Sequence, residues 1–300
     1  MTWHLVPSGF SGARVWHGDL DGVPHVALKA WPTGTPAERV QQIHTWMAQA
    51  EHLPFVPRLE NPTVCVEAGR VWDCCQWQPG TPRLTPSLAE VEQACEAVGH
   101  LHGTWTSTTR GPCPGVLNRL RILAENEPLL LAGPTALPPV SPQLDPLLRR
   151  AVTAAAQAAP HTVRSLRRWE HQVVALQPCV RDLRGEHVLF EGGRVSGIID
   201  YGAMGVDHPA VDLARLLGDF AKGDDAMFTG GLTAYRRVRS EFAMPDEFVQ
   251  LLSQSGAVCS VLGWLVRLVV RREPVLDVVP LCARLAQLVA RVELFTRVSR

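Results

Sequence analysis

The most informative part of this chain is VRDLRGEHVLF at residues 180–190, followed by VSGIIDYG at residues 195–202. Each contains a run of apolar residues typical of a buried β-strand, and Gly192-Gly193 between them is a turn sequence, which predicts a hairpin. Asp182 precedes the first strand and Asp200 follows the second. Two carboxylates are therefore expected beside buried apolar strands.

Such carboxylates lose water on folding, which is unfavourable unless cations or hydrogen bonds compensate. One interpretation is a Mg²⁺ ion that bridges phosphate oxygens, with Asp200 as a ligand and Asp182 close to an acceptor hydroxyl. The alternative is structural: Asp182 pairs with Arg181 or Arg184, and Asp200 caps a turn. The residues alone leave both interpretations open.

The composition is that of an ordinary folded protein, with 46% apolar and 19% charged residues among 300. The formal net charge is zero, so neither nucleic acid nor an anionic membrane is expected as a partner. Residues 1–7 resemble no leader, which predicts a cytoplasmic protein. The uncharged run between Glu247 and Arg267 contains several polar residues and is expected to be a buried helix rather than a membrane span.

The eight cysteines show no C-x-x-C spacing. Adjacent Cys74 and Cys75 would point to opposite faces of a strand, which suits neither a zinc site nor a disulfide between them. Reduced, mostly buried thiols are expected.

The first eighty residues are predicted to be rich in β-structure, with turns at residues 18–22 and at Ala68-Gly69. The predicted strands span residues 13–17, 24–31, 63–67 and 70–76, and one helix spans residues 36–50. After the turn sequence at Pro79-Gly80 the chain is predicted to be mainly helical. Helices are expected at residues 87–106, 116–131, 143–158, 163–175, 211–220 and 224–241, with two more towards the C-terminus.

Residues 180–202 resemble the catalytic and metal-binding loops of the aminoglycoside phosphotransferase and homoserine/choline kinase-like family. That family usually reads HGDLHPGNVLF and then IDWG, where this chain reads VRDLRGEHVLF and IDYG. Downstream, DHPAVDLA at residues 207–214 is similar to the DPxxDLA start of a family helix. The resemblance extends over nearly the whole chain and is most specific between residues 179 and 219.

The resemblance implies an α+β, two-lobed protein-kinase-like fold. A small antiparallel β-sheet lobe with one helix would span residues 1–78 and bind nucleotide, and a larger helical lobe would span residues 79–300 and hold the acceptor site. The implied activity is ATP-dependent transfer of the γ-phosphate to a hydroxyl of a small molecule, with ATP and Mg²⁺ as cofactors. Asp182 would then be the catalytic base and Asp200 a metal ligand.

Upstream residues agree with this pattern in their order. Ser11 and Gly12 lie in a glycine-containing loop that could cover phosphates through backbone N–H groups, with an ordinary turn as the alternative. Lys29 resembles the kinase lysine that contacts the α- and β-phosphates, with a solvated strand lysine as the alternative. The segment that resembles the adenine-binding hinge consists of Gln76, Trp77 and Gln78.

Kinases of this type hold that lysine with an acidic residue of a nearby helix. The candidates here are Glu38, early in the predicted helix, and His44, which falls nearer the usual spacing. If His44 occupies the position, the ion pair with Lys29 is weakened or absent. His102 matches a family Leu-His sequence and is expected to be a structural hydrogen-bonding residue.

His187 stands where the family has Asn. An amide oxygen suits Mg²⁺, whereas an imidazole nitrogen suits Mn²⁺, Zn²⁺ or Fe²⁺ better. His187 and Asp200 are therefore candidate metal ligands, with Mn²⁺ as the alternative to Mg²⁺. The competing hypothesis is a pseudokinase, which would bind nucleotide or a protein partner without turnover.

The acceptor is predicted only as a small hydroxyl-bearing molecule. Many arginines in the C-terminal third, among them Arg237, Arg239 and Arg267, disfavour a cationic aminoglycoside. Trp105, Phe220 and Trp264 could line an apolar acceptor pocket, with core packing as the alternative. No oligomeric state is predicted.

Overall fold

The N-terminal sheet is built from short strands joined by tight turns. The computed structural model describes residues 1–6, 12–275 and 277–298. Five antiparallel strands lie in the order β1-β2-β3-β5-β4. They are β1 (Thr2–Leu5), β2 (Arg14–Leu20), β3 (Val23–Ala30), β4 (Cys65–Glu67) and β5 (Arg70–Gln76). Asp21 and Gly22 both have positive φ in the two-residue turn that joins β2 to β3, a conformation that suits the twist of a hairpin.

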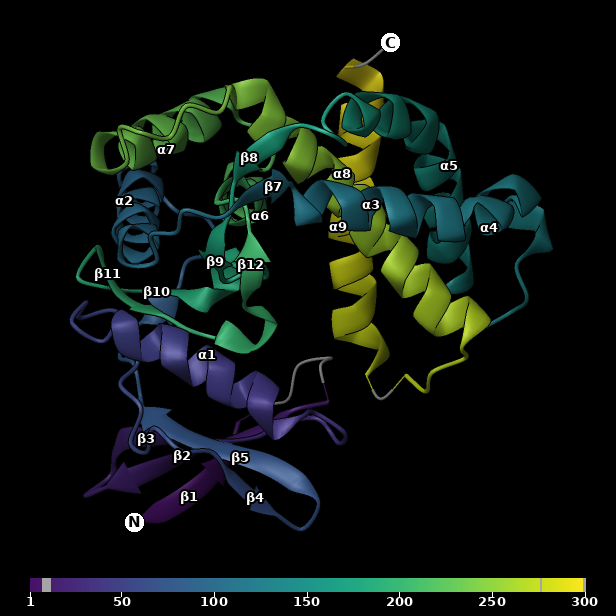
Figure 1. Cartoon of the computed structure of the whole chain (residues 1–300). Coiled ribbons are helices and arrows are strands. Elements are labelled where there is room, and N and C mark those ends of the chain that lie inside the picture. Colours follow the sequence, from purple (N-terminus) through teal and green to yellow (C-terminus); the bar gives the residue numbers. More distant parts are fainter. Residues whose placement is uncertain (7–11, 276, 299–300) are drawn as a thin grey trace. The chain divides into compact units, whose positions relative to one another are not determined.

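Both predicted N-terminal hairpins are confirmed, and β2 is longer than expected. β1 has no counterpart in the prediction. All four of its residues are exposed, so it shows no apolar alternation that the sequence could reveal. The predicted helix is α1 (Ala37–Gln49), which lies over one face of the sheet (Figure 1) and buries Val40, Ile43, His44 and Met47.

The chain divides into two compact units. The first consists of residues 1–107, 177–206 and 229–242, and the second of residues 108–176, 207–228 and 243–300. The lobe boundary predicted between Gln78 and Pro79 lies inside the first unit and stays a prediction.

Besides the sheet, the first unit contains the predicted hairpin of β10 (Val188–Glu191) and β11 (Arg194–Ile198). β6 (Thr81–Pro82) pairs with β10, and α2 (Leu88–Thr104) packs against β11 and β9 (Gln177–Cys179). The turn before β6 packs closely against the β10–β11 hairpin. Gly80 has φ +99°, and a Cβ there would lie 2.3 Å from Ser196 Oγ and 2.8 Å from the Phe190 carbonyl oxygen. Ser196 Oγ in turn donates to the Pro79 carbonyl oxygen at 2.7 Å.

The second unit is mainly helical, and α8 lies in its core, where it contacts α3, α5, α6 and α9. Its helices are α3 (Pro114–Glu125), α4 (Glu127–Ala132), α5 (Asp145–Arg167), α6 (Ala210–Ala221), α8 (Asp246–Leu265) and α9 (Val278–Val298). Its short strands are β7 (Arg110–Pro112) and β8 (Val173–Ala175), which pair with each other. β12 (Gly205–Asp207) and α7 (Asp225–Val238) contribute residues to both units.

α8 and the π-helix that follows it, η4 (Val266–Val270), together are long and apolar enough to span a membrane by length and composition alone. Ten residues of α8 are buried inside the unit, among them Leu252, Val261 and Leu262. This packing is that of the buried helix which the sequence predicts.

Three predicted helix boundaries are wrong. The helix expected at residues 116–131 divides into α3 and α4 at Asn126, because Pro128 has no N–H with which to continue the α3 ladder. The helices expected at residues 143–158 and 163–175 are joined in the single helix α5, which begins at Asp145, ends at Arg167 and contains Pro160. Buried residues on both sides of that proline, such as Ala158 and Thr162, keep the helix continuous. Val173–Ala175 is the strand β8 instead of the end of a helix.

Candidate functional site

A cavity of about 360 Å³ lies in the first unit, a volume suited to a small-molecule ligand. It is lined by residues of β2, β3, α1 and β5, by the segment after β5, and by residues between 187 and 202. Six of the predicted site residues line it, namely Lys29, Gln76, Trp77, Gln78, His187 and Asp200. The fold thus brings together side chains that are far apart in the sequence.

Lys29 and Asp200 contact each other directly. Lys29 lies in β3, where it pairs with Val15 of β2 and Asp73 of β5. Its Nζ donates a hydrogen bond of 2.9 Å to Asp200 Oδ1 and lies 4.5 Å from the centroid of the Trp31 ring. A Cβ at Gly202 would lie 3.3 Å from Lys29 Nζ and 3.2 Å from Asp200 Oδ1, so a residue without a side chain suits this position.

Asp200 follows β11 and has a left-handed backbone, with φ 60° and ψ 65°, which is unfavourable for a residue with a side chain. The preceding Ile199 N–H donates to the His187 carbonyl oxygen at 2.9 Å. Partial burial disfavours the ionised carboxylate, but Lys29, His187 and the Gly202 N–H more than offset this and lower the pKa of Asp200. Asp200 is therefore an anion at neutral pH.

His187 ends the short 3₁₀-helix η2 (Gly185–His187) and is buried. Its Nδ1 lies 2.9 Å from the Asp182 carbonyl oxygen. Because a carbonyl only accepts, Nδ1 carries the proton, which directs the lone pair of a neutral imidazole to Nε2. Nε2 lies 3.8 Å from Asp200 Oδ2 and 3.8 Å from Glu186 Oε1. A backbone carbonyl holds many metal-binding histidines in this way, so His187 and Asp200 could hold a divalent cation.

Two predicted site residues, Asp182 and Gly12, are not among the described residues that line the cavity, and a third lies outside the described residues. The carbonyl oxygen of Asp182 holds His187, but the Asp182 side chain is not among the described groups that line the cavity. Gly12 has φ +78°, and a Cβ built there would lie 4.0 Å from Pro32 Cβ. Gly12 is also not among the described residues that line the cavity. Ser11 lies outside the described residues.

The segment Gln76, Trp77 and Gln78 begins at the last residue of β5, continues past the strand and lines the cavity. The Gln76 N–H donates to the Arg58 carbonyl oxygen at 2.7 Å, and the Trp77 N–H donates to the His25 carbonyl oxygen at 2.9 Å. The Cβ that Gly197 lacks would lie 2.8 Å from Gln78 Cβ. The sheet and the β10–β11 hairpin therefore fix this segment from two sides.

Two cavity residues, Trp31 and Asp73, escape prediction from sequence. The Trp31 Nε1–H donates to Asp73 Oδ2 at 2.7 Å. The available signal is the two-residue period of an extended chain: Trp31, one residue past the end of β3, falls on the same face as Lys29, and Asp73 is the cross-strand partner of Lys29. That signal locates Asp73 only if the register between β3 and β5 is known, and the sequence does not give this register.

Neither predicted helix partner contacts Lys29. Glu38 is exposed in the first turn of α1. His44 is 1% exposed, and its Nε2 lies 3.2 Å from Asp73 Oδ2, while its Nδ1 lies 3.3 Å from the Pro62 carbonyl oxygen. The helix residue at the expected spacing therefore contacts an acid of β5 instead of Lys29.

The arginines used to disfavour a cationic acceptor are partly neutralised by acids. Arg237 pairs with Glu92 and Glu96, and Arg239 pairs with Glu241. Arg267 pairs with Glu273; it also lies over the ring of Trp264, at 4.7 Å. The number of arginines thus overstates the positive charge that is free to repel a cation.

Trp105 and Phe220, two of the residues considered for an apolar acceptor pocket, are core residues, 1% and 4% exposed.

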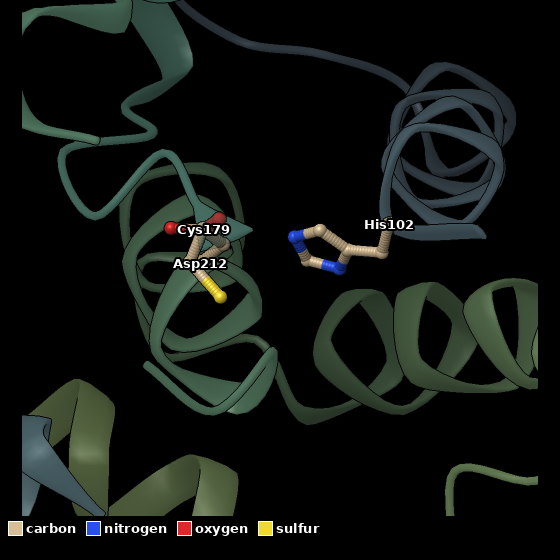
Figure 2. A group of neighbouring side chains, drawn as sticks. All are labelled: His102, Cys179 and Asp212. Atoms are coloured by element: carbon tan, nitrogen blue, oxygen red, sulfur yellow. The ribbon is translucent and has the colours of Figure 1, made fainter. Parts of the chain in front are cut away.

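His102 is buried and hydrogen-bonded, as the sequence predicts. Figure 2 shows its ring, which projects from α2 towards the part of β9 that contains Cys179. Its Nδ1 lies 2.9 Å from the Tyr235 hydroxyl, and its carbonyl oxygen accepts from Gln177 Nε2 at 2.9 Å. None of the eight cysteines is in a disulfide, and burial, with a contribution from Asp73, raises the pKa of the cavity residue Cys75 to about 12.

The comparison with protein families decides the membership of this chain. Residues 2–245 match the sequence model of the phosphotransferase enzyme family, which is more than half of the chain. The chain belongs to this phosphotransferase enzyme family. No curated protein matches its sequence significantly.

Solved structures of phosphotransferases share the fold at low identity. Spectinomycin phosphotransferase APH(9)-Ia, in complex with ADP and spectinomycin, has a TM-score of 0.71 and 10% identity over 99% of this chain and 93% of its own. Macrolide 2'-phosphotransferase MphH from Brachybacterium faecium has a TM-score of 0.56 and 16% identity over 88% and 87%. A thermostable mutant of aminoglycoside phosphotransferase APH(4)-Ia, in a ternary complex with AMP-PNP and hygromycin B, has a TM-score of 0.59 and 12% identity over 99% and 93%. The predicted α+β, protein-kinase-like fold is thereby confirmed.

Proposed function

We propose that this phosphotransferase transfers the γ-phosphate of ATP to a hydroxyl group of a small molecule. Family membership and the solved relatives support a phosphotransferase of small molecules, and relatives bound to AMP-PNP or ADP support the use of a nucleotide. The observation that favours ATP most directly is the Lys29–Asp200 pair, which lies in a cavity that residues 76–78 also border.

Each residue then has a distinct role. Residues 76–78 receive the adenine ring, and Lys29 binds phosphate oxygens. Asp182 accepts the proton of the acceptor hydroxyl as a general base. Gly12, with Ser11 beside it, covers the phosphates through backbone N–H groups.

Asp200 and His187 would hold the divalent cation, which when bound neutralises charge on the phosphates. An imidazole nitrogen in the donor set suits Mn²⁺ better than Mg²⁺. The proposal is therefore a metal site that works with Mn²⁺ at least as well as with Mg²⁺.

The test is ATP turnover, measured with Mg²⁺ and with Mn²⁺ for the native chain and for Asp182→Asn. Removal of a general base lowers turnover by about 10²- to 10⁴-fold, while nucleotide affinity should change little. Glu191→Gln, at the exposed end of β10, is the matched control and should keep native turnover. Equal background rates in every sample would contradict catalysis.

The second candidate function is a pseudokinase. One observation favours it: His187, an imidazole, stands in the candidate metal site where the family usually has Asn. This candidate predicts that ATP raises the temperature of unfolding in the native chain and in Asp182→Asn equally, without turnover in either.

The acceptor is proposed as a hydroxyl-bearing small molecule, since the solved relatives are named for macrolide, spectinomycin and aminoglycoside substrates. A panel of neutral and cationic acceptors, compared by ADP release, measures the charge preference. A cytoplasmic location is likewise proposed, and cysteines that form no disulfide are compatible with a reducing compartment.

A further inference from the structure

Lys29 has one acidic partner in the described part of the chain. Asp200 is the only carboxylate there within ion-pair distance of its Nζ. Under the proposed function, Asp200 is also a metal ligand, so the metal competes with Lys29 for the same carboxylate. A second group is then needed to keep the ammonium directed into the cavity.

The indole ring of Trp31 is in the position to be that group. Lys29 Nζ lies over the ring, 4.5 Å from its centroid, within the range in which an aromatic face attracts a cation. Trp31 is 6% exposed and borders the cavity. A ring face attracts the ammonium without a charge of its own, so it does not compete with phosphate oxygens as a carboxylate would.

The orientation of the ring is fixed by a short chain of hydrogen bonds. Trp31 Nε1–H donates to Asp73 Oδ2 at 2.7 Å, and His44 Nε2 lies 3.2 Å from the same oxygen. The other nitrogen of His44 faces the Pro62 carbonyl oxygen at 3.3 Å. Because His44 is a buried residue of α1, this chain connects the helix to the lysine through Asp73 and Trp31.

We propose that Trp31, oriented by Asp73 and His44, is a positioning residue for Lys29 and replaces the lysine–glutamate ion pair between strand and helix. The inference rests on the proposed function, since it concerns the nucleotide site. His44 lies in α1 near the position at which related kinases have the acid that pairs with this lysine. Its imidazole contacts the Asp73 carboxylate, which accepts from the Trp31 indole, and the indole ring contacts Lys29.

The experiment is a double-mutant cycle on nucleotide affinity. The Kd of AMP-PNP with Mn²⁺ is measured by calorimetry for the native chain, Trp31→Leu, Lys29→Met and the double variant. Loss of a cation–π contact should weaken binding by about 2- to 30-fold. If Trp31 acts through Lys29, the double variant binds no more weakly than Lys29→Met alone.

Two further variants separate positioning from packing. Trp31→Phe keeps a ring face and should retain more affinity than Trp31→Leu, while Asp73→Asn keeps the volume of the side chain but weakens the anchor. Trp16→Leu is the matched control, because Trp16 pairs with Leu28 and so lies on the opposite face of the sheet from Lys29. It should leave the affinity unchanged. Thermal unfolding of every variant identifies any that fail to fold.

The outcomes distinguish this inference from the proposed function. If the native chain binds no nucleotide, or Lys29→Met binds as well as the native chain, the proposed function fails and the inference fails with it. If Lys29→Met loses affinity but Trp31→Leu does not, or the two losses are additive, only the positioning role is overturned.

Discussion

Lys29 and Asp200 are 171 positions apart in the sequence and 2.9 Å apart at their polar atoms. The contact depends on Asp200 keeping a left-handed backbone, a conformation that costs about 1–3 kcal/mol unless the surroundings impose it. The hydrogen bond from Ile199 to the His187 carbonyl is part of those surroundings. One loop thus fixes both the carboxylate and the imidazole of the candidate metal site.

His187→Asn restores the residue that the family usually has. An amide oxygen is a harder ligand than an imidazole nitrogen and suits Mg²⁺ better. We therefore expect the ratio of turnover with Mg²⁺ to turnover with Mn²⁺ to be several-fold higher in the variant than in the native chain. The measurement is the rate of ADP release across a titration of each metal. His52→Asn, an exposed histidine outside the cavity, is the control. An unchanged ratio would indicate that His187 does not contact the metal.

At the scale of elements, α2 begins with a reciprocal capping box between Ser87 and Glu90. The Ser87 N–H donates to Glu90 Oε2 at 2.8 Å, and the Glu90 N–H donates to Ser87 Oγ at 3.3 Å. The bond from the Ser87 backbone, with contributions from the Ser87 and Arg83 side chains, lowers the pKa of Glu90 below 4.5 despite slight burial. The helix that contains His102 therefore starts at a residue that the local sequence defines.

We expect Ser87→Ala to lower the free energy of unfolding by about 1 kcal/mol at neutral pH. Because the folded pKa of Glu90 is lowered, its contribution is complete above the unfolded value and is lost as the pH falls below 4.5. The stability difference between the native chain and Glu90→Gln should therefore shrink in acid. Urea denaturation at a series of pH values measures it. A difference that grows in acid would contradict the assigned cap.

The cavity is lined by residues of the first unit alone among those described. A nucleotide at a concentration of 100 times its Kd raises the free energy of unfolding of the protein that binds it by about 2.7 kcal/mol. We expect hydrogen exchange to slow most in β3, β5 and residues 187–202, and least in α5 and α9 of the second unit. Exchange measured with and without AMP-PNP and Mn²⁺ tests this. Slowing confined to the second unit would place the nucleotide elsewhere.

Prediction from sequence succeeded where the signal was local. Turn residues and alternating apolar residues located β2, β3, β5 and the β10–β11 hairpin, and a proline-led helical pattern located α1. Prediction failed for elements whose structure depends on contacts with distant parts of the chain. β1 has no buried residue to reveal it, and α5 continues through Pro160 because the residues on both sides are buried against other helices.

The sequence by itself determined the family, the α+β class and six of the residues that line the cavity, because these depend on short motifs and on the period of each strand. Only the tertiary structure decided that Lys29 contacts Asp200, that His44 contacts Asp73, and that Trp31 lies between that acid and the lysine. Those contacts join segments distant in the chain. They depend on strand register and on the path of the loop before Asp200, which no single stretch of residues encodes.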